Sequence, residues 1–279
     1  MTTADLTALS PLIALALTAA VIMLQIAVRR HHGAVLGTSL TGLAAALACL
    51  FVVVRWSIGP ATALLMMDTQ ALFFIGLILL ATGGSAMFAH TYLHRSAEHR
   101  EEFYLLLVLA ALGAAVLAAS RHFAAFFIGL EILSIALYAL VAYFRRRSVC
   151  IEAGLKYLIL AGVSSAFLLF GMALIYLDAG TLDFARFGTR LAADPHTGGT
   201  VIVLFGTGML VVGIGFKLAL FPFHMWTPDV YQGAPAPVAG FVAAVSKTAV
   251  VAALVRLFAS HDEAVFDYIA FRRDIEGLA

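Results

Sequence analysis

Residues 215–238 read GFKLALFPFHMWTPDVYQGAPAPV, and no other stretch of the sequence is as informative. It places Lys217 in an apolar segment, interrupts that segment at Pro222 and continues with His224. Proline removes a backbone donor and clashes with the preceding turn, so the stretch predicts a broken helix near Pro222. Within a membrane, a broken helix is tolerated where it lines a hydrated cavity, and it often marks an ion site.

The composition predicts a polytopic membrane protein. The chain has 279 residues, of which 63% are hydrophobic and 12% are charged, figures well outside the range of soluble domains. The net charge of +1 gives no reason to expect a nucleic-acid partner, and the longest basic tract is 145–147. The two cysteines, Cys49 and Cys150, lie far apart and predict neither a disulfide framework nor a metal site.

Long apolar runs predict about eight transmembrane helices, because a helix needs about 20 apolar residues to cross the hydrocarbon core. The runs are continuous and lack the alternation of a membrane barrel, so helices are expected rather than strands. The predicted spans are 11–28, 34–54, 71–90, 103–119, 123–144, 151–177, 200–220 and 237–258.

The arginines predict the orientation of these spans. Before the tail at 259–279, seven arginines lie in the loops on one side and five lie in the loops and at the ends on the other. This bias places the loops at 29–33, 91–102, 145–150 and around 232 in the cytoplasm. The N-terminus is then expected outside. The segment 259–279 is too polar to span a membrane.

The three lysines all lie in apolar segments, whereas the fourteen arginines lie in loops or at span ends. Burial penalises the charged form of lysine, so a buried lysine can release its proton, which arginine hardly does. Lys247 and Glu131 lie near the middle of their spans, where a charge costs about 3 kcal/mol on insertion scales. Each of these residues could instead have a purely structural role. Lys247 and Glu131 could form a structural ion pair, Lys217 could cap broken backbone, and Lys156 could extend its charge to the membrane interface.

These residues predict a proton relay through Glu131, Lys217, His224 and Lys247. Histidine titrates near neutral pH and suits such a path. A re-entrant loop that merely caps the fold is the competing interpretation of the break. Trp226, near a span end, is expected to anchor the chain at the membrane interface.

The stretch FKLALFPFHMWTPDVYQGAPAPV, the following SKTAV, and the segments around GLEILS and EAGLKY resemble subunit N of bacterial proton-pumping NADH:quinone oxidoreductase, respiratory complex I. The resemblance covers residues 1–258. It implies an all-α antiporter-like fold with N-terminal helices over 1–102, a five-helix repeat over 103–258 and a polar tail over 259–279. The family continues with a second, inverted repeat, so the chain is expected to be truncated.

The resemblance also implies roles. Glu131 would pair with Lys217, Lys247 would continue a hydrated central path, and Lys156 would belong to the same polar set. The chain would be a translocase subunit in the bacterial inner membrane, with other membrane subunits of complex I, lipid and protons as its partners. It would hold no cofactor; FMN, iron–sulfur clusters and quinone would bind elsewhere in the complex. The alternatives are a cation/proton antiporter subunit and a non-conducting scaffold or remnant.

Overall fold

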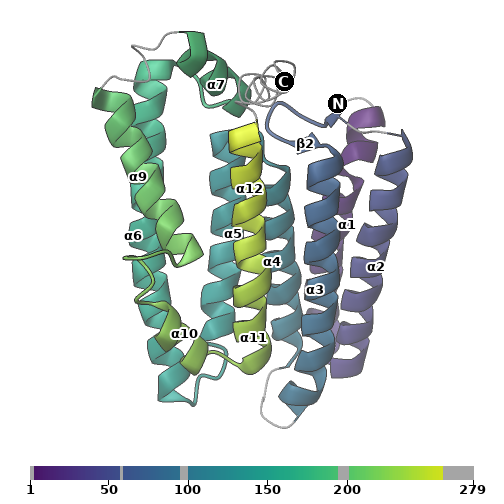
Figure 1. Ribbon diagram of the computed structural model, residues 1–279. Helices are drawn as coiled ribbons and strands as arrows, with labels where there is room; N and C mark the ends of the chain where they lie inside the picture. Colours follow the sequence, from purple (N-terminus) through teal and green to yellow (C-terminus); the bar gives the residue numbers. More distant parts are fainter. Residues whose placement is uncertain (1–2, 57–58, 95–99, 194–200, 260–279) are drawn as a thin grey trace, which may run out of the picture.

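The structure, a computed structural model, describes residues 3–56, 59–94, 100–193 and 201–259 as a bundle of long helices (Figure 1). A helix satisfies its backbone hydrogen bonds within the segment, and this makes helices the stable form of such apolar segments in lipid. The helices are α1 (Thr3–Val28), α2 (His32–Trp56), α3 (Thr69–His94), α4 (Glu101–Ala119), α5 (Phe123–Val141), α6 (Ser148–Ala179), α7 (Phe184–Ala193), α9 (Val201–Leu218), α10 (Thr227–Gly233), α11 (Ala236–Phe241) and α12 (Lys247–Ala259).

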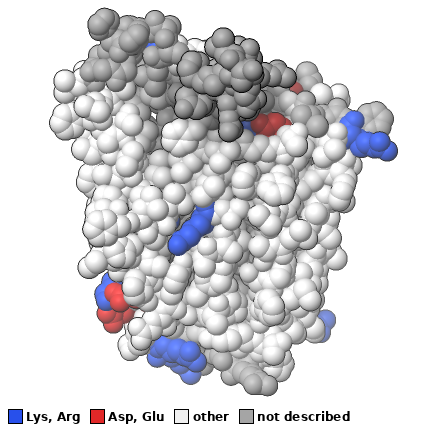
Figure 2. Space-filling view, viewed as in Figure 1, with Lys and Arg blue, Asp and Glu red and all other residues white. Residues whose placement is uncertain are grey.

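Within the described residues, eight helices are long and apolar enough to cross a membrane, which confirms the predicted fold class. The last of these spans, Ala236–Phe258, combines α11, the π-helical turn η1 (Val242–Ser246) and α12. On the face in Figure 2, charged residues gather toward the two ends, and the middle is almost entirely uncharged. The predicted polar tail lies outside the described residues from 260 onward.

Helix α4 lies at the centre of the bundle and packs against α1, α2, α3, α5 and α12. Helix α9 packs chiefly on α6, and the two form one side of the molecule (Figure 1). The N-terminus lies at the upper end in Figure 1, so α1 ends and α2 begins at the lower end. Helix α3 ends and α4 begins at this same lower end, where the loop between α5 and α6 also lies.

Two helix pairs approach so closely that glycine is required at the contact. A Cβ on Gly113 of α4 would lie 2.4 Å from the Leu133 nitrogen of α5, and a Cβ on Gly171 of α6 would lie 2.6 Å from the Gly206 oxygen of α9. Small residues at such contacts let helix backbones pack tightly in membranes, where the hydrophobic effect does not drive helix association. These contacts hold α4 against α5 and α6 against α9.

Backbone hydrogen bonds connect the loops at the upper end. Strands β1 (Gly59–Pro60) and β2 (Met66–Met67) pair antiparallel. The Arg121 amide then donates to the Leu64 oxygen at 3.0 Å, and the Phe184 amide donates to the Arg121 oxygen at 3.0 Å. The loops after α2, α4 and α6 are thereby held together above the helices.

Candidate functional site

The predicted break in the seventh span is present, and it begins before the proline. Helix α9 ends at Leu218, and Ala219 follows in the left-handed region with φ 58°. The Ala219 amide donates to the Phe216 oxygen at 3.0 Å and the Leu220 amide to the Gly215 oxygen at 2.8 Å. This pair of bonds is a Schellman motif, which satisfies the last carbonyls of a helix. The break near Pro222 is therefore confirmed, but its first residue is Ala219.

Lys217 occupies the last turn of α9, and its side chain reaches another helix. The residue is 7% exposed, and its Nζ donates to the Ser134 Oγ of α5 at 2.8 Å. The last turn of a helix carries partial negative charge on its carbonyls, which favours a cation there. The broken helix thus places a buried ammonium group between α9 and α5.

Glu131 lies one turn before Ser134 on the same face of α5 and is half-buried. It accepts a hydrogen bond from the Ser165 hydroxyl of α6. No ion pair within 4.0 Å joins Glu131 to Lys217 among the described residues; each charge bonds a serine instead. The acid and the base implied by the resemblance therefore meet α5 one turn apart: Glu131 belongs to that helix, and Lys217 of α9 bonds its Ser134. The hydrogen bonds of both groups run to hydroxyl groups.

Trp226, the last residue of the broken segment between α9 and α10, is buried. Its ring stacks on Tyr157 of α6 at 5.0 Å and on Phe216 of α9 at 5.4 Å between centroids. Its Nε1 donates to the Phe216 oxygen at 3.0 Å. Since Trp226 is 3% exposed, the prediction that it anchors the chain at the membrane interface is wrong. Instead it holds the segment between α9 and α10 against α6.

Lys247 begins α12 directly after the π-helical turn η1. Its Nζ lies 6.0 Å from the centre of the Tyr231 ring on α10, at the outer limit of a cation–π contact. Single π-helical turns within α-helices, such as η1, often occur at functional sites. The predicted mid-span lysine is thus half-buried and faces the short helix that follows the break.

Lys156 and His224, the other two predicted relay residues, lie at the surface. The Lys156 Nζ bonds Asp229 of α10 at 2.7 Å and Glu152 of its own helix at 2.8 Å, and its side chain is 45% exposed. His224 is exposed, with its ring 5.8 Å from that of Phe221. The structure therefore brings Glu131 and Lys217 together but leaves these two outside the buried group. Across the described residues, no group of three or more His, Cys, Asp or Glu is placed to hold a metal ion.

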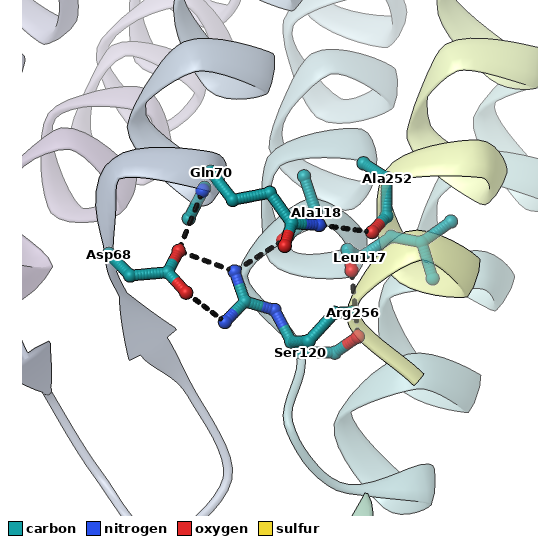
Figure 3. Close-up of polar contacts among 8 residues, drawn as sticks. Asp68, Gln70, Leu117, Ala118, Ser120, Ala252 and Arg256 are labelled. Carbon is teal, nitrogen blue, oxygen red and sulfur yellow. Dashed lines mark hydrogen bonds and ion pairs between the residues drawn. The ribbon is translucent and has the colours of Figure 1, made fainter. Parts of the chain in front are cut away.

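A second buried polar cluster lies near the upper end, and sequence analysis did not find it (Figure 3). Arg256 of α12 reaches Asp68, directly before α3, with two bonds of 2.7 Å. The Arg256 Nη2 also approaches the Ala118 oxygen at 3.4 Å, and the Gln70 Nε2 donates to the Ala252 oxygen at 2.8 Å. This cluster, Asp68, Gln70 and Arg256, ties α12 to α3 and α4.

Asp68 keeps its negative charge in this cluster. Burial acts to raise the pKa of Asp68, but hydrogen bonds from the Arg256 side chain and the Ala71 amide outweigh it and hold the pKa below its usual value. Asp68 also caps α3, since the Ala71 amide donates to its Oδ1 at 2.8 Å. The pair is therefore charged, and both partners have fixed positions.

The sequence did contain signals for the residues that were missed. Ser134 stands three residues after Glu131 in GLEILS, and that spacing places both on one helix face. Ser165 lies in an apolar span, where a hydroxyl needs a partner. Asp68 precedes a long apolar run, as helix-capping residues do. What the sequence lacks is the identity of each partner, because these contacts join residues that are far apart along the chain.

Comparison with known proteins identifies the relatives of the chain. Residues 120–271 match the family described as NADH:quinone oxidoreductase/Mrp antiporter, TM. In respiratory complex I from Thermus thermophilus with bound aureothin, one chain is 38% identical, with a TM-score of 0.75 over 88% of this chain and 52% of that chain.

Two further complexes contain similar chains. The archaeal membrane-bound sulfane sulfur reductase matches with 25% identity and a TM-score of 0.79, over 92% of this chain and 54% of that chain. A chain of the Mrp complex from Dietzia sp. DQ12-45-1b matches with 20% identity and a TM-score of 0.78, over 94% of this chain and 50% of that chain. At this identity the likeness shows the fold alone. The chain thus spans about half the length of these solved chains.

Proposed function

This chain belongs to the NADH:quinone oxidoreductase/Mrp antiporter transmembrane family, and we propose that it is a proton-translocating membrane subunit of an NADH:quinone oxidoreductase. One observation carries the proposal: Lys217 bonds Ser134, and Glu131, one turn away on α5, bonds Ser165. A hydroxyl both donates and accepts hydrogen bonds, so it can pass a proton between an acid and a base. The group lies inside the membrane-spanning bundle, where fixed charges without a function are costly.

The roles we propose follow from the position of each residue. Lys217 exchanges a proton at the broken end of α9, and Glu131 biases that exchange through its negative charge. Lys247, beside Tyr231, receives the proton next. Lys156 and His224 complete the set at the surface, where protons enter or leave the path.

We propose that electron transfer from NADH to quinone elsewhere in the complex drives this path and that protons move outward. FMN, iron–sulfur clusters and quinone would then bind to other subunits. The partners of this chain would be the other membrane subunits, and its location the bacterial inner membrane, with the loop at 145–150 in the cytoplasm. The 38% identity to a chain of respiratory complex I supports this choice over the 20% identity to a chain of the Mrp complex.

The second candidate is a subunit of a cation/proton antiporter without a redox partner, which the family description also covers. Both functions use buried acids and lysines. They differ in the driving force, because only the first depends on oxidation of NADH.

The proposal is tested by NADH-driven proton uptake into inverted membrane vesicles, with the content of the complex normalised. Losing a positioned proton-transfer group typically slows its step about 100-fold or more. We therefore expect Lys217→Ala to close the path through this chain and to lower the number of protons taken up per NADH oxidised. Arg55→Ala, at an exposed position in the last turn of α2, is the matched control and should leave uptake unchanged.

Lys217→Arg separates charge from proton exchange. Arginine keeps the positive charge but hardly releases its proton, so we expect uptake to stay low in this variant. Unchanged uptake in Lys217→Ala at equal complex content would instead indicate a non-conducting scaffold. Proton movement that needs a sodium gradient and no NADH would indicate the antiporter.

A further inference from the structure

Three buried hydroxyl groups near the broken helix have no hydrogen-bond partner among the described residues. They belong to Tyr138 of α5 and to Thr227 and Tyr231 of α10. A buried polar group without a partner is costly, and native proteins usually satisfy such groups with protein atoms or with ordered water. The three hydroxyls therefore indicate a place beside the break where water binds.

Tyr138 continues the polar face of α5 that holds Lys217. It stands four residues after Ser134, a spacing that places both residues on one helix face. Its hydroxyl lies beside Ser134 and in the electrostatic field of Glu131, but it makes no hydrogen bond of ordinary geometry to a described residue. Since Lys217 donates to Ser134, Tyr138 carries the next hydroxyl along α5 from that ammonium group.

Tyr231 stands in a similar position relative to Lys247. The Lys247 Nζ lies 6.0 Å from the centre of the Tyr231 ring. Thr227 stands four residues before Tyr231, on the same face of α10. Helix α10 therefore carries two buried hydroxyls on one face, beside the second lysine of the proposed path.

Tyr157 of α6 connects these two groups. Helices α5 and α10 both pack on α6. The Tyr157 ring is buried and meets the Tyr138 ring edge to face, with 5.2 Å between centroids. Tyr157 also lies close enough to Tyr231 to interact with it electrostatically, and it stacks on Trp226 at 5.0 Å. Tyr138 and Tyr231 therefore both adjoin one tightly packed ring.

We propose that Tyr138 and Tyr231 pass protons between Lys217 and Lys247, with water bound to their hydroxyls and to that of Thr227. This inference rests on the proposed function, in which a proton moves from the first lysine to the second. Phenylalanine at either tyrosine position would pack equally well and would bury no hydroxyl. The hydroxyls therefore have a use that packing alone does not supply.

The transfer balances without a further reactant. The Lys217 ammonium gives a proton to the Ser134 oxygen, and Ser134 releases its own hydroxyl proton through water toward Tyr138. Each hydroxyl and each water then accepts one proton and donates another. The neutral amine of Lys247, beside Tyr231, takes the last proton. No group is oxidised or reduced, and Lys217 becomes neutral.

The test measures NADH-driven proton uptake per NADH in inverted vesicles that contain the whole complex, normalised to complex content. Tyr138→Phe and Tyr231→Phe each remove one hydroxyl and keep the ring. Losing a positioned proton-transfer group slows its step about 100-fold or more. We therefore expect each variant to lower uptake as far as Lys217→Ala does. Tyr176→Phe is the matched control, since Tyr176 is exposed on α6 and should leave uptake unchanged.

The double variant Tyr138→Phe/Tyr231→Phe separates proton transfer from packing. Groups that act as one unit fail together, so the double variant should lower uptake no further than either single variant. Losses that add would indicate two independent packing effects and would overturn the inference. Unchanged uptake in Tyr138→Phe, with reduced uptake in Lys217→Ala, would overturn the inference but not the proposed function. Unchanged uptake in Lys217→Ala would overturn both.

Discussion

Arg256 and Lys217 are both buried cations that reach a neighbouring helix, but they meet different partners. Arg256 forms two bonds of 2.7 Å to the carboxylate of Asp68. Lys217 bonds the neutral hydroxyl of Ser134 at 2.8 Å, and its nearby acid, Glu131, bonds a different serine. The first cation is neutralised where it lies, and the second is held by a group that carries no charge.

This difference separates a structural pair from a group that can change its protonation. A bidentate pair with arginine is rigid, and arginine does not release its proton. A lysine held by a hydroxyl can be protonated or neutral without breaking its contact, because serine donates as well as accepts. The Asp68–Arg256 pair fixes α12 to α3, and Lys247, which begins α12, depends on that position.

The largest effect on stability is expected for Arg256→Ala, which leaves the charge of Asp68 without its partner. Removing one partner of a buried pair typically costs about 3–5 kcal/mol, and we expect about 3 because Asp68 is partly exposed. The free energy of unfolding in a denaturing detergent titration measures the loss.

The double variant Asp68→Leu/Arg256→Met is the control for that prediction. It removes both charges, so much of the lost stability should return. A double variant as unstable as Arg256→Ala would contradict the description of this pair as a charge-balanced contact.

A smaller effect on stability is expected for Ser134→Ala, which deprives the Lys217 ammonium of its bonded hydroxyl. The loss of one such hydrogen bond costs about 1–3 kcal/mol. We expect proton uptake per NADH to fall even after correction for any loss of folded complex, with both quantities measured on the same preparations. Thr41→Ala removes an exposed hydroxyl that bonds only its own helix, and it should change neither quantity. Loss of stability with normal uptake would make Ser134 a packing residue.

The smallest effect is expected for Ala219→Gly at the end of α9. Ala219 has φ 58°, a conformation that costs a residue with a Cβ about 1 kcal/mol. Glycine should therefore raise the free energy of unfolding by at most that amount, and Ala219→Val should lower it. A destabilising Ala219→Gly would mean that flexibility of the unfolded chain outweighs the strain at the break.

Much of the fold and part of the site could be predicted from the sequence. The eight spans were predictable because each is a local run of apolar residues whose backbone bonds close within the run. The break near Pro222 was predictable from proline chemistry, though its start at Ala219 was not, since an alanine in the left-handed region has no local signature. The buried positions of Lys217 and Glu131 followed from their places in the spans.

Tertiary structure alone decided which polar groups meet. Ser134 and Ser165 come to Lys217 and Glu131 from other helices, and Asp68 lies 188 positions from Arg256 along the chain. Trp226 entered the core because Tyr157 and Phe216 stack against it. The sequence by itself determined which charges stand within apolar spans, since a span is a local run of hydrophobic residues. The partner of each charge depends on which helix faces are packed together, and that is a property of the whole bundle.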